Sequence, residues 1–141
     1  AVQEGVVPGG GIALIRTIGS LDLIEGDNKD QDTGINIIKL SLESPLRTIV
    51  ENSGGEGSVI AQRVKQESGD FGYNARTEKF ENLYNAGVID PTKVTRLALE
   101  KSASIASLLL TTECVISENE DDKNSNASPT PPMGGGMGGM M

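Results

Sequence analysis

The sequence contains 141 residues with a formal net charge of -8 and a pI of about 4.5, which makes nucleic acid and anionic membranes poor partners. Aromatic residues make up only 3%, so a core must be built from Ile, Leu, Val and Ala. Histidine is absent and cysteine occurs once, at Cys114, which excludes an internal disulfide, a zinc site and a histidine-based triad and suits a reducing compartment.

The chain begins with a segment, residues 1–8, that reads either as the end of a helix or as an entering strand. Pro8-Gly9-Gly10-Gly11 interrupts it, because proline cannot donate a backbone hydrogen bond and glycines free the backbone. The following residues, 12–21, predict a helix that is apolar almost all round and hence buried. By itself the glycine stretch is either a plain loop-to-helix junction or a loop that a ligand can approach closely.

The central part of the chain reads as helical. Residues 30–52 carry apolar side chains three or four positions apart and predict one long helix, kinked at Pro45. A shorter helix is expected over residues 57–67.

The later part of the chain combines a hairpin, a long helix and a possible strand. Strands are expected at residues 71–74 and 77–80, followed by a helical turn over residues 81–85. Residues 92–113 then predict one long helix with an inward face made of Val94, Leu97, Ala98, Ile105, Leu108 and Leu109. Residues 114–117 could form a short strand, which would need partner strands from elsewhere.

Three positions could carry binding chemistry, and each has a plainer structural alternative. The Asn74 amide could pair with the edge of a base or could stabilise a turn. Asp90 precedes Pro91 at a helix start and is expected to be the N-cap, and its second oxygen could also hold a ribose hydroxyl. Val88 and Ile89 could cover a flat ring or belong to the core.

Several short motifs of this sequence resemble those of the group I, GroEL-type chaperonins. EGVVPGGGIALIR opens the chain, GYNA and GVIDPTKVTR follow in the middle, SASIASLLLTTECVI comes later, and MGGGMGGMM ends the sequence. These motifs occur in the family's order and spacing, and the resemblance covers the chain except for a variable acidic stretch around residues 117–132. The resemblance implies that the chain is a C-terminal piece of such a protein.

The resemblance implies a nucleotide site. In this family the matching glycine loop, Asn-Ala pair and aspartate line the adenine and ribose end of the ATP or ADP site, which points to Gly10, Asn74, Ala75 and Asp90. Many family members have a further alanine where this chain has Arg76. The family's phosphate loop, its Mg²⁺ ligands and its catalytic aspartate are expected upstream of residue 1, so no catalytic or metal-binding residue is assigned here, and the 141-residue chain alone is expected to be inactive.

The resemblance also implies the architecture. We expect a mainly α fold, the C-terminal half of the chaperonin equatorial domain, with a short β-hairpin and a terminal β-strand. Residues 1–117 would form this incomplete domain, and residues 118–141 would form a disordered acidic and Gly/Met-rich tail.

The implied function is that of an ATP-dependent chaperonin, which folds and refolds non-native proteins inside a ring chamber. The implied partners are identical subunits in stacked rings, a co-chaperonin lid and unfolded clients, without nucleic acid or membrane. The implied location is the bacterial cytoplasm, with the mitochondrial matrix or a plastid as alternatives. The competing hypothesis is a helical oligomerisation module that binds no ligand.

Overall fold

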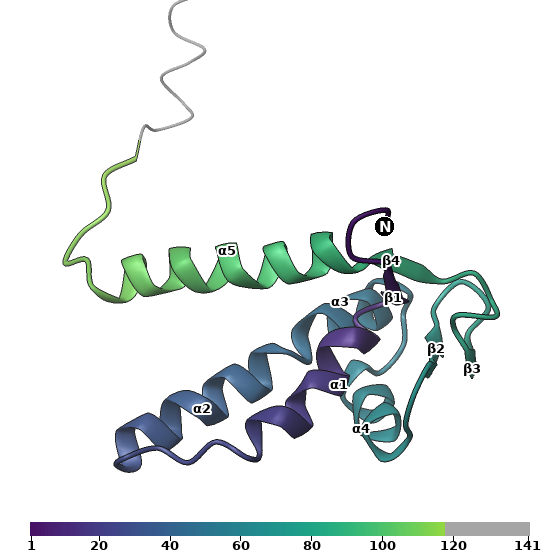
Figure 1. Cartoon of the computed structure of the whole chain (residues 1–141), viewed down its shortest axis with the longest axis horizontal. Helices are drawn as coiled ribbons and strands as arrows, with labels where there is room; N and C mark the ends of the chain where they lie inside the picture. Colours follow the sequence, from purple (N-terminus) through teal and green to yellow (C-terminus); the bar gives the residue numbers. More distant parts are fainter. Residues whose placement is uncertain (118–141) are drawn as a thin grey trace, which may run out of the picture. The chain divides into compact units, whose positions relative to one another are not determined.

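The computed structural model describes residues 1–117 and shows a mainly helical domain with two small two-stranded sheets (Figure 1), which confirms the expected fold class. The described chain falls into two compact units, Ala1–Ile105 and the residues from Ala106 onward. The predicted tail lies outside the described residues. The elements in chain order are β1 (Val6–Pro8), α1 (Ile12–Leu21), α2 (Lys29–Ser41), α3 (Ser44–Asn52), α4 (Gly57–Gln66), β2 (Phe71–Asn74), β3 (Lys79–Asn82), β4 (Ile89–Pro91) and α5 (Thr92–Leu110).

The first sheet joins the beginning of the chain to the start of α5. Strand β1 pairs antiparallel with β4, with Val7 opposite Asp90. Two hydrogen bonds extend the pairing on either side, from the Gly9 amide to the Val88 carbonyl at 2.9 Å and from the Thr92 amide to the Gly5 carbonyl at 3.1 Å. Residues 6–8 therefore form the entering strand, one of the two alternatives that the sequence left open.

Side chains reinforce this junction. Arg96 on α5 donates to both carboxylate oxygens of Glu4, at 2.7 and 3.1 Å, and to Glu100 one turn further along. The hydrogen bond from Arg96 holds the pKa of the exposed Glu4 carboxyl below its ordinary value. The same two carboxylates raise the pKa of Arg96, so the group stays charged.

The second sheet is a hairpin of β2 and β3, with Phe71 opposite Asn82 and Asn74 opposite Lys79. The predicted second strand, residues 77–80, was placed two residues too early. Four residues, 75–78, form the turn, and Glu78 takes a positive φ of 55°. The predicted helical turn is also displaced, because the chain turns at residues 83–87 after the later end of β3.

The predicted long helix over residues 30–52 is two helices. Helix α2 ends at Ser41, Leu42 and Glu43 link the two, and α3 begins at Ser44. Pro45 stands in the first turn of α3, where the proline lacks a backbone N–H that would have no partner within the helix. The prediction of a kinked continuous helix was therefore wrong, since proline starts a new helix here.

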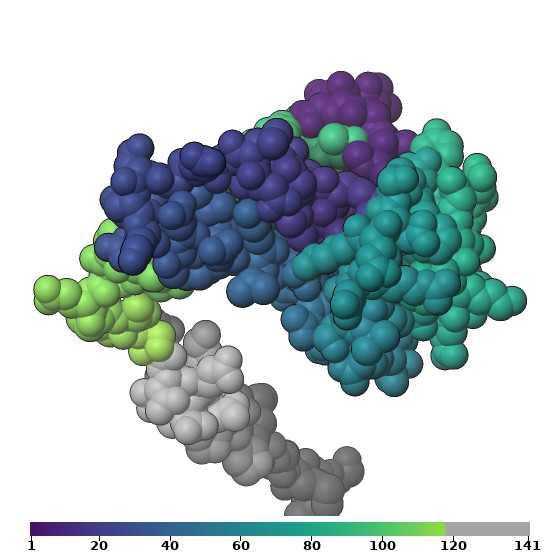
Figure 2. Space-filling model, turned by 90° about the horizontal axis from the view of Figure 1, so that it is seen from below, coloured from purple at the N-terminus to yellow at the C-terminus, as the bar shows by residue number. Residues whose placement is uncertain are grey.

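The core lies where α1, α3, α4 and β2 meet. In Figure 2 the teal surface of α4 and the hairpin lies against the purple surface of α1. The core cluster is aliphatic apart from one tyrosine and consists of Ile12, Ile15, Leu46, Val50, Ala61, Val64, Tyr73 and Leu83. Helix α1 is buried only on the face that carries Ile12 and Ile15, so the expectation that it is buried all round was wrong.

Arg16 binds α1 to the chain between α4 and β2. Its guanidinium donates to three carbonyl oxygens, those of Val64 at 2.6 Å, Phe71 at 2.7 Å and Gly69 at 3.0 Å. Partial burial lowers the pKa of Arg16, and the nearby Glu67 carboxylate opposes that shift. One side chain thus satisfies three backbone acceptors at the end of α4 and the start of the hairpin.

The expected inward face of the last helix is not covered. Helix α5 ends at Leu110, three residues before the predicted end, and none of its residues is buried. Val94, Ile105 and Leu108 are each about 60% exposed (61%, 59% and 64%). Leu97 is half-buried, so apolar spacing identifies a face that can be buried but does not show how much of it is covered.

The expected terminal strand is absent from the described part of the chain. Residues 114–117 have no regular structure, and Val115 and Ile116 are exposed. A strand needs a hydrogen-bonded neighbour, and none of the described residues pairs with this segment. Among the helices of residues 1–117, none has both the length and the apolar character needed to cross a bilayer.

The three hydrogen bonds of Arg16 lead to a stability prediction. Arg16→Met should lower the free energy of unfolding by about 2–4 kcal/mol, because part-buried carbonyls lose a charged donor. Arg16→Lys should recover only a fraction, since a single ammonium cannot reproduce the planar guanidinium fork. Urea unfolding followed by far-UV circular dichroism measures the change. Arg47→Met is the control, because the Arg47 side chain makes no hydrogen bond or ion pair to the described residues, and equal losses in the two variants would contradict the prediction.

Candidate functional site

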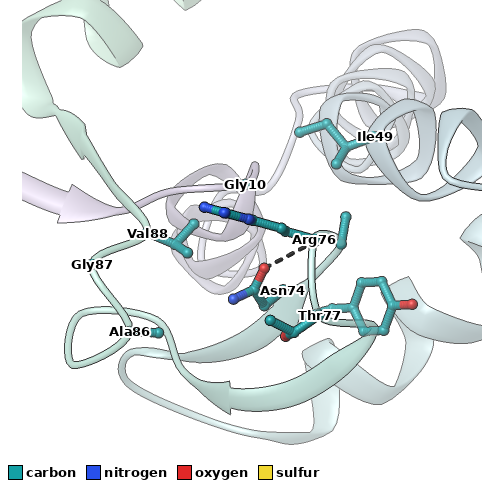
Figure 3. Close-up of a pocket in the computed structure, with 10 residues that line it drawn as sticks. Gly10, Ile49, Asn74, Arg76, Thr77, Ala86, Gly87 and Val88 are labelled. Atoms are coloured by element: carbon teal, nitrogen blue, oxygen red, sulfur yellow. Dashed lines mark hydrogen bonds between the residues drawn. The ribbon is translucent and has the colours of Figure 1, made fainter.

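The four candidate residues border two adjoining cavities. The hairpin cavity has a volume of about 580 Å³ and is lined by Gly10, Ile49, Tyr73, Asn74, Ala75, Arg76, Thr77, Ala86, Gly87 and Val88 (Figure 3). The helix cavity, of about 550 Å³, is bordered by α1, α3, α5 and the segment between α2 and α3, and Asp90 is among its lining residues. Gly10 and Ile49 line both cavities, so the predicted residues do come together around the glycine loop.

The first sheet is what brings them together. Pairing of β1 with β4 places the loop of Gly9, Gly10 and Gly11 beside residues 88–90. Gly10 and Gly11 have φ values of 66° and 82°, a region that side chains other than glycine rarely adopt. A Cβ on Gly11 would lie 2.7 Å from the Leu46 amide nitrogen, so only glycine lets the loop approach α3 this closely.

Asp90 lies at the middle of β4 and faces the glycine loop. A Cβ on Gly9 would come within 3.3 Å of the Asp90 carboxylate, so the absence of a side chain there leaves room for that group. Helix α5 begins at Thr92, and the Asp90 side chain accepts no hydrogen bond from its amides, so the N-cap prediction was wrong. The reason is that Asp90 belongs to strand β4, which extends to Pro91. The Asp90 carboxylate accepts no hydrogen bond from the described residues, and both oxygens remain available to a ligand.

Asn74 is 8% exposed and stabilises the hairpin turn. Its Nδ2 donates to Oε1 of Glu81 at 2.7 Å. Its Oδ1 accepts from the Arg76 amide at 3.1 Å, the bond that Figure 3 shows as a dashed line. The turn-stabilising role that the sequence offered is therefore present. An amide has two N–H groups and two lone pairs on oxygen, so each end keeps one hydrogen-bonding position beyond the turn.

The walls of the hairpin cavity are largely apolar. Ala75 and Val88 line it, whereas Ile89 is 43% exposed and lines neither cavity. Ile49 shares the helical spacing of the neighbouring apolar residues, yet it is 39% exposed and contributes to both cavities. Nothing in the local sequence around Ile49 distinguishes it from a core position.

The chemical character of this arrangement is that of a binding site. An apolar slot with a fixed amide suits a flat heteroaromatic ring, and a free carboxylate beside a glycine loop suits a hydroxylated group. Among residues 1–117 no group of three His, Cys, Asp or Glu side chains is placed to hold a metal ion.

Comparisons with known proteins agree with this fold. The sequence profile described as the TCP-1/cpn60 chaperonin family matches residues 1–120. Among solved structures, the chain is similar to the open-state monomer of a group II chaperonin from Methanococcoides burtonii, with 17% sequence identity and a TM-score of 0.67. The match covers 76% of this chain and 28% of that one, so the chain spans little more than a quarter of its structural relative.

The glycine loop supplies a matched pair of variants. Gly11→Ala should lower the free energy of unfolding by about 1–3 kcal/mol more than Gly10→Ala, because its Cβ collides with the Leu46 backbone. The nearest atom to a Cβ on Gly10 is the Tyr73 carbonyl oxygen at 3.8 Å, so that variant carries only the strain of its positive φ. Urea unfolding midpoints measure the difference, and equal destabilisation would refute the close approach to α3.

Proposed function

Because the chain belongs to the TCP-1/cpn60 chaperonin family, we propose that the hairpin and helix cavities form the adenine and ribose end of an ATP site. The observation that carries the proposal is that two polar groups with free hydrogen-bonding positions lie around one glycine loop. These groups are the remaining hydrogen-bonding positions of the Asn74 amide and the carboxylate of Asp90.

The hairpin cavity fits a purine base. Its volume of about 580 Å³ is within the usual range for small-molecule sites, and its walls are mostly apolar. Adenine presents adjacent donor and acceptor positions at its edge, which complement the free N–H and the free lone pair of Asn74. The hydrogen bonds to Glu81 and to the Arg76 amide fix the Asn74 side chain before a ligand arrives, which reduces the entropy lost on binding.

The ribose is assigned to Asp90 and the glycine loop. A carboxylate can accept hydrogen bonds from two neighbouring hydroxyl groups, and Asp90 has both oxygens available. Gly10 lines both cavities and has no side chain, so a sugar can lie against its backbone between the base and the carboxylate. Ala75 completes the wall beside Asn74.

Bound ATP would supply the γ-phosphoryl group whose hydrolysis drives a chaperonin cycle. The residues of this chain would hold and orient the base and sugar. We assign the phosphate loop, the Mg²⁺ ligands and the residue that positions the attacking water to parts of the protein outside these 141 residues, so this chain alone would not hydrolyse ATP.

For the whole protein we propose a group I chaperonin that uses ATP to fold non-native proteins in a ring of identical subunits closed by a co-chaperonin. This assignment rests on the sequence motifs GYNA and GVIDPTKVTR and on the Met- and Gly-rich segment MGGGMGGMM. The structural similarity to a group II chaperonin supports the shared fold.

A second candidate function, assembly between subunits, is favoured by the residues after α5. Val115 and Ile116 are β-branched, 71% and 93% exposed, and free of any strand partner among the described residues. Such residues favour extended structure, and a neighbouring subunit can supply the missing strand. This role is compatible with the ATP site, and without that site it becomes the alternative of a ligand-free oligomerisation module.

The ribose assignment is tested with Asp90→Ala in the full-length natural protein. We expect ATP to bind about 10- to 100-fold more weakly, because hydrogen bonds between the carboxylate and the sugar hydroxyls are lost. The same variant should bind 2′,3′-dideoxy-ATP as the parent does. Isothermal titration calorimetry measures both, with Asp27→Ala as the control for loss of an exposed negative charge. Unchanged ATP affinity with intact rings would refute the ribose assignment.

The assembly role is tested with the double variant Val115→Asp and Ile116→Asp. Two buried charges in an intersubunit strand should reduce the ring population to a minor fraction, as measured by native mass spectrometry. Thr112→Asp, which adds charge before the segment, should leave rings intact. Complete rings in the double variant would contradict the proposal.

A further inference from the structure

Arg76 is the one charged residue among those that line the hairpin cavity. Its backbone is fixed, because its amide donates to Oδ1 of Asn74 at 3.1 Å. Its side chain is exposed, and the guanidinium makes no hydrogen bond or ion pair to the described residues. In Figure 3 the side chain extends across the cavity toward Val88 and Gly10.

From this placement we infer that Arg76 is a specificity-determining residue that closes over the face of the nucleobase. The inference rests on the proposed function, because it needs a base in the hairpin cavity. The guanidinium would act as a planar cation stacked on one face of the ring, with Val88 among the apolar side chains that contact the ring. Since Asn74 holds the turn, the Arg76 side chain starts from a fixed backbone position and can close without moving the hairpin.

The chemistry of the guanidinium favours this role. The group is flat, delocalised and weakly hydrated, so it stacks on aromatic rings at a lower desolvation cost than a lysine ammonium. Attraction between a cation and a π-system is greatest when both are removed from water, and the other walls of this cavity are mostly apolar. The larger purine ring offers more area for this contact than a pyrimidine.

The position of Arg76 argues for the base and against the phosphates. Arg76 shares its cavity with the Asn74 amide, whereas the carboxylate assigned to the ribose lines the other cavity. Phosphate groups would extend from the sugar, and the apolar neighbours of Arg76, such as Ala75 and Ala86, offer a dianion no hydrogen bonds from their side chains. A flat ring is the part of a nucleotide that fits beside these residues.

The test compares Arg76→Ala and Arg76→Lys with the parent in the full-length natural protein. Calorimetry would measure binding of adenosine, ADP, ATP, CTP and ribose 5-triphosphate. Arg76→Ala should weaken adenosine, ADP and ATP by the same factor, roughly 3- to 30-fold, and leave ribose 5-triphosphate unchanged. CTP should lose less than ATP, and Arg76→Lys should recover only a small part of the loss, because an ammonium keeps the charge but has no plane to stack.

Lys79→Ala is the matched control. Lys79 lies on β3 of the same hairpin, is exposed and is not among the lining residues of either cavity, so its loss removes the same charge without removing the stack. Equal weakening by Lys79→Ala and Arg76→Ala would mean that net charge alone acts, and it would overturn the inference. A loss that grows from adenosine to ATP and shrinks with added salt would also overturn it, because that pattern indicates a phosphate contact.

The outcomes separate this inference from the proposed function. If Asp90→Ala weakens ATP binding while Arg76→Ala binds adenosine as the parent does, the proposed nucleotide site is supported and the proposed role of Arg76 is wrong. If the parent binds no adenosine and Asp90→Ala leaves ATP binding unchanged, the proposed function is wrong, and so is this inference, which depends on it. Arg76→Ala removes an exposed side chain without partners among the described residues, so ring mass and thermal unfolding should match the parent.

Discussion

The pairing of β1 with β4 is the constraint on which the rest of the site depends. Three residue pairs, from Val6–Pro91 to Pro8–Ile89, join the first residues of the chain to the start of α5. That short ladder decides where the glycine loop lies, and the loop in turn decides where α1 begins. Because Gly11 approaches the backbone of Leu46, α3 is held against the same loop. The two cavities exist because these segments converge.

The core supports this arrangement through side chains that each serve several elements. Ile12 lies directly after the glycine loop and is fully buried, and a Cβ on Gly72 would come within 2.6 Å of its side chain. The hairpin therefore packs onto the first turn of α1 with no space to spare. Glu43, 8% exposed, forms an ion pair with Lys65 and connects the segment before α3 to α4. A partly buried pair of this kind costs desolvation, and it serves to fix the position of the helices.

Local sequence signals predicted the local structure well. The helix over residues 12–21 and the first hairpin strand were predicted with the observed bounds, and a glycine shortly precedes the start of each. The second hairpin strand was predicted two residues too early, since the Arg76 amide donates to Asn74 within a four-residue turn. The prediction for Pro45 was wrong because a proline that kinks a helix and one that starts a helix look alike in sequence. Burial of α5 was the largest error: periodicity shows which face is apolar, and what covers that face depends on residues elsewhere.

The candidate site was predictable where it depends on unusual residues and not where it depends on shape. Sequence motifs identified four candidate residues, Gly10, Asn74, Ala75 and Asp90. The fold places them around two neighbouring cavities, and their contacts with a nucleotide are a proposal. Ile49 could not be found, because an exposed isoleucine in a wall and a buried one in a core follow the same spacing. Asn74 has a consequence of its own. The amide that closes the hairpin turn also faces the cavity, so the fold of the turn and the shape of the pocket are not separate properties. A substitution that destabilises the turn will therefore also weaken ligand binding. Conversely, a ligand that hydrogen-bonds to this amide will stabilise the folded hairpin.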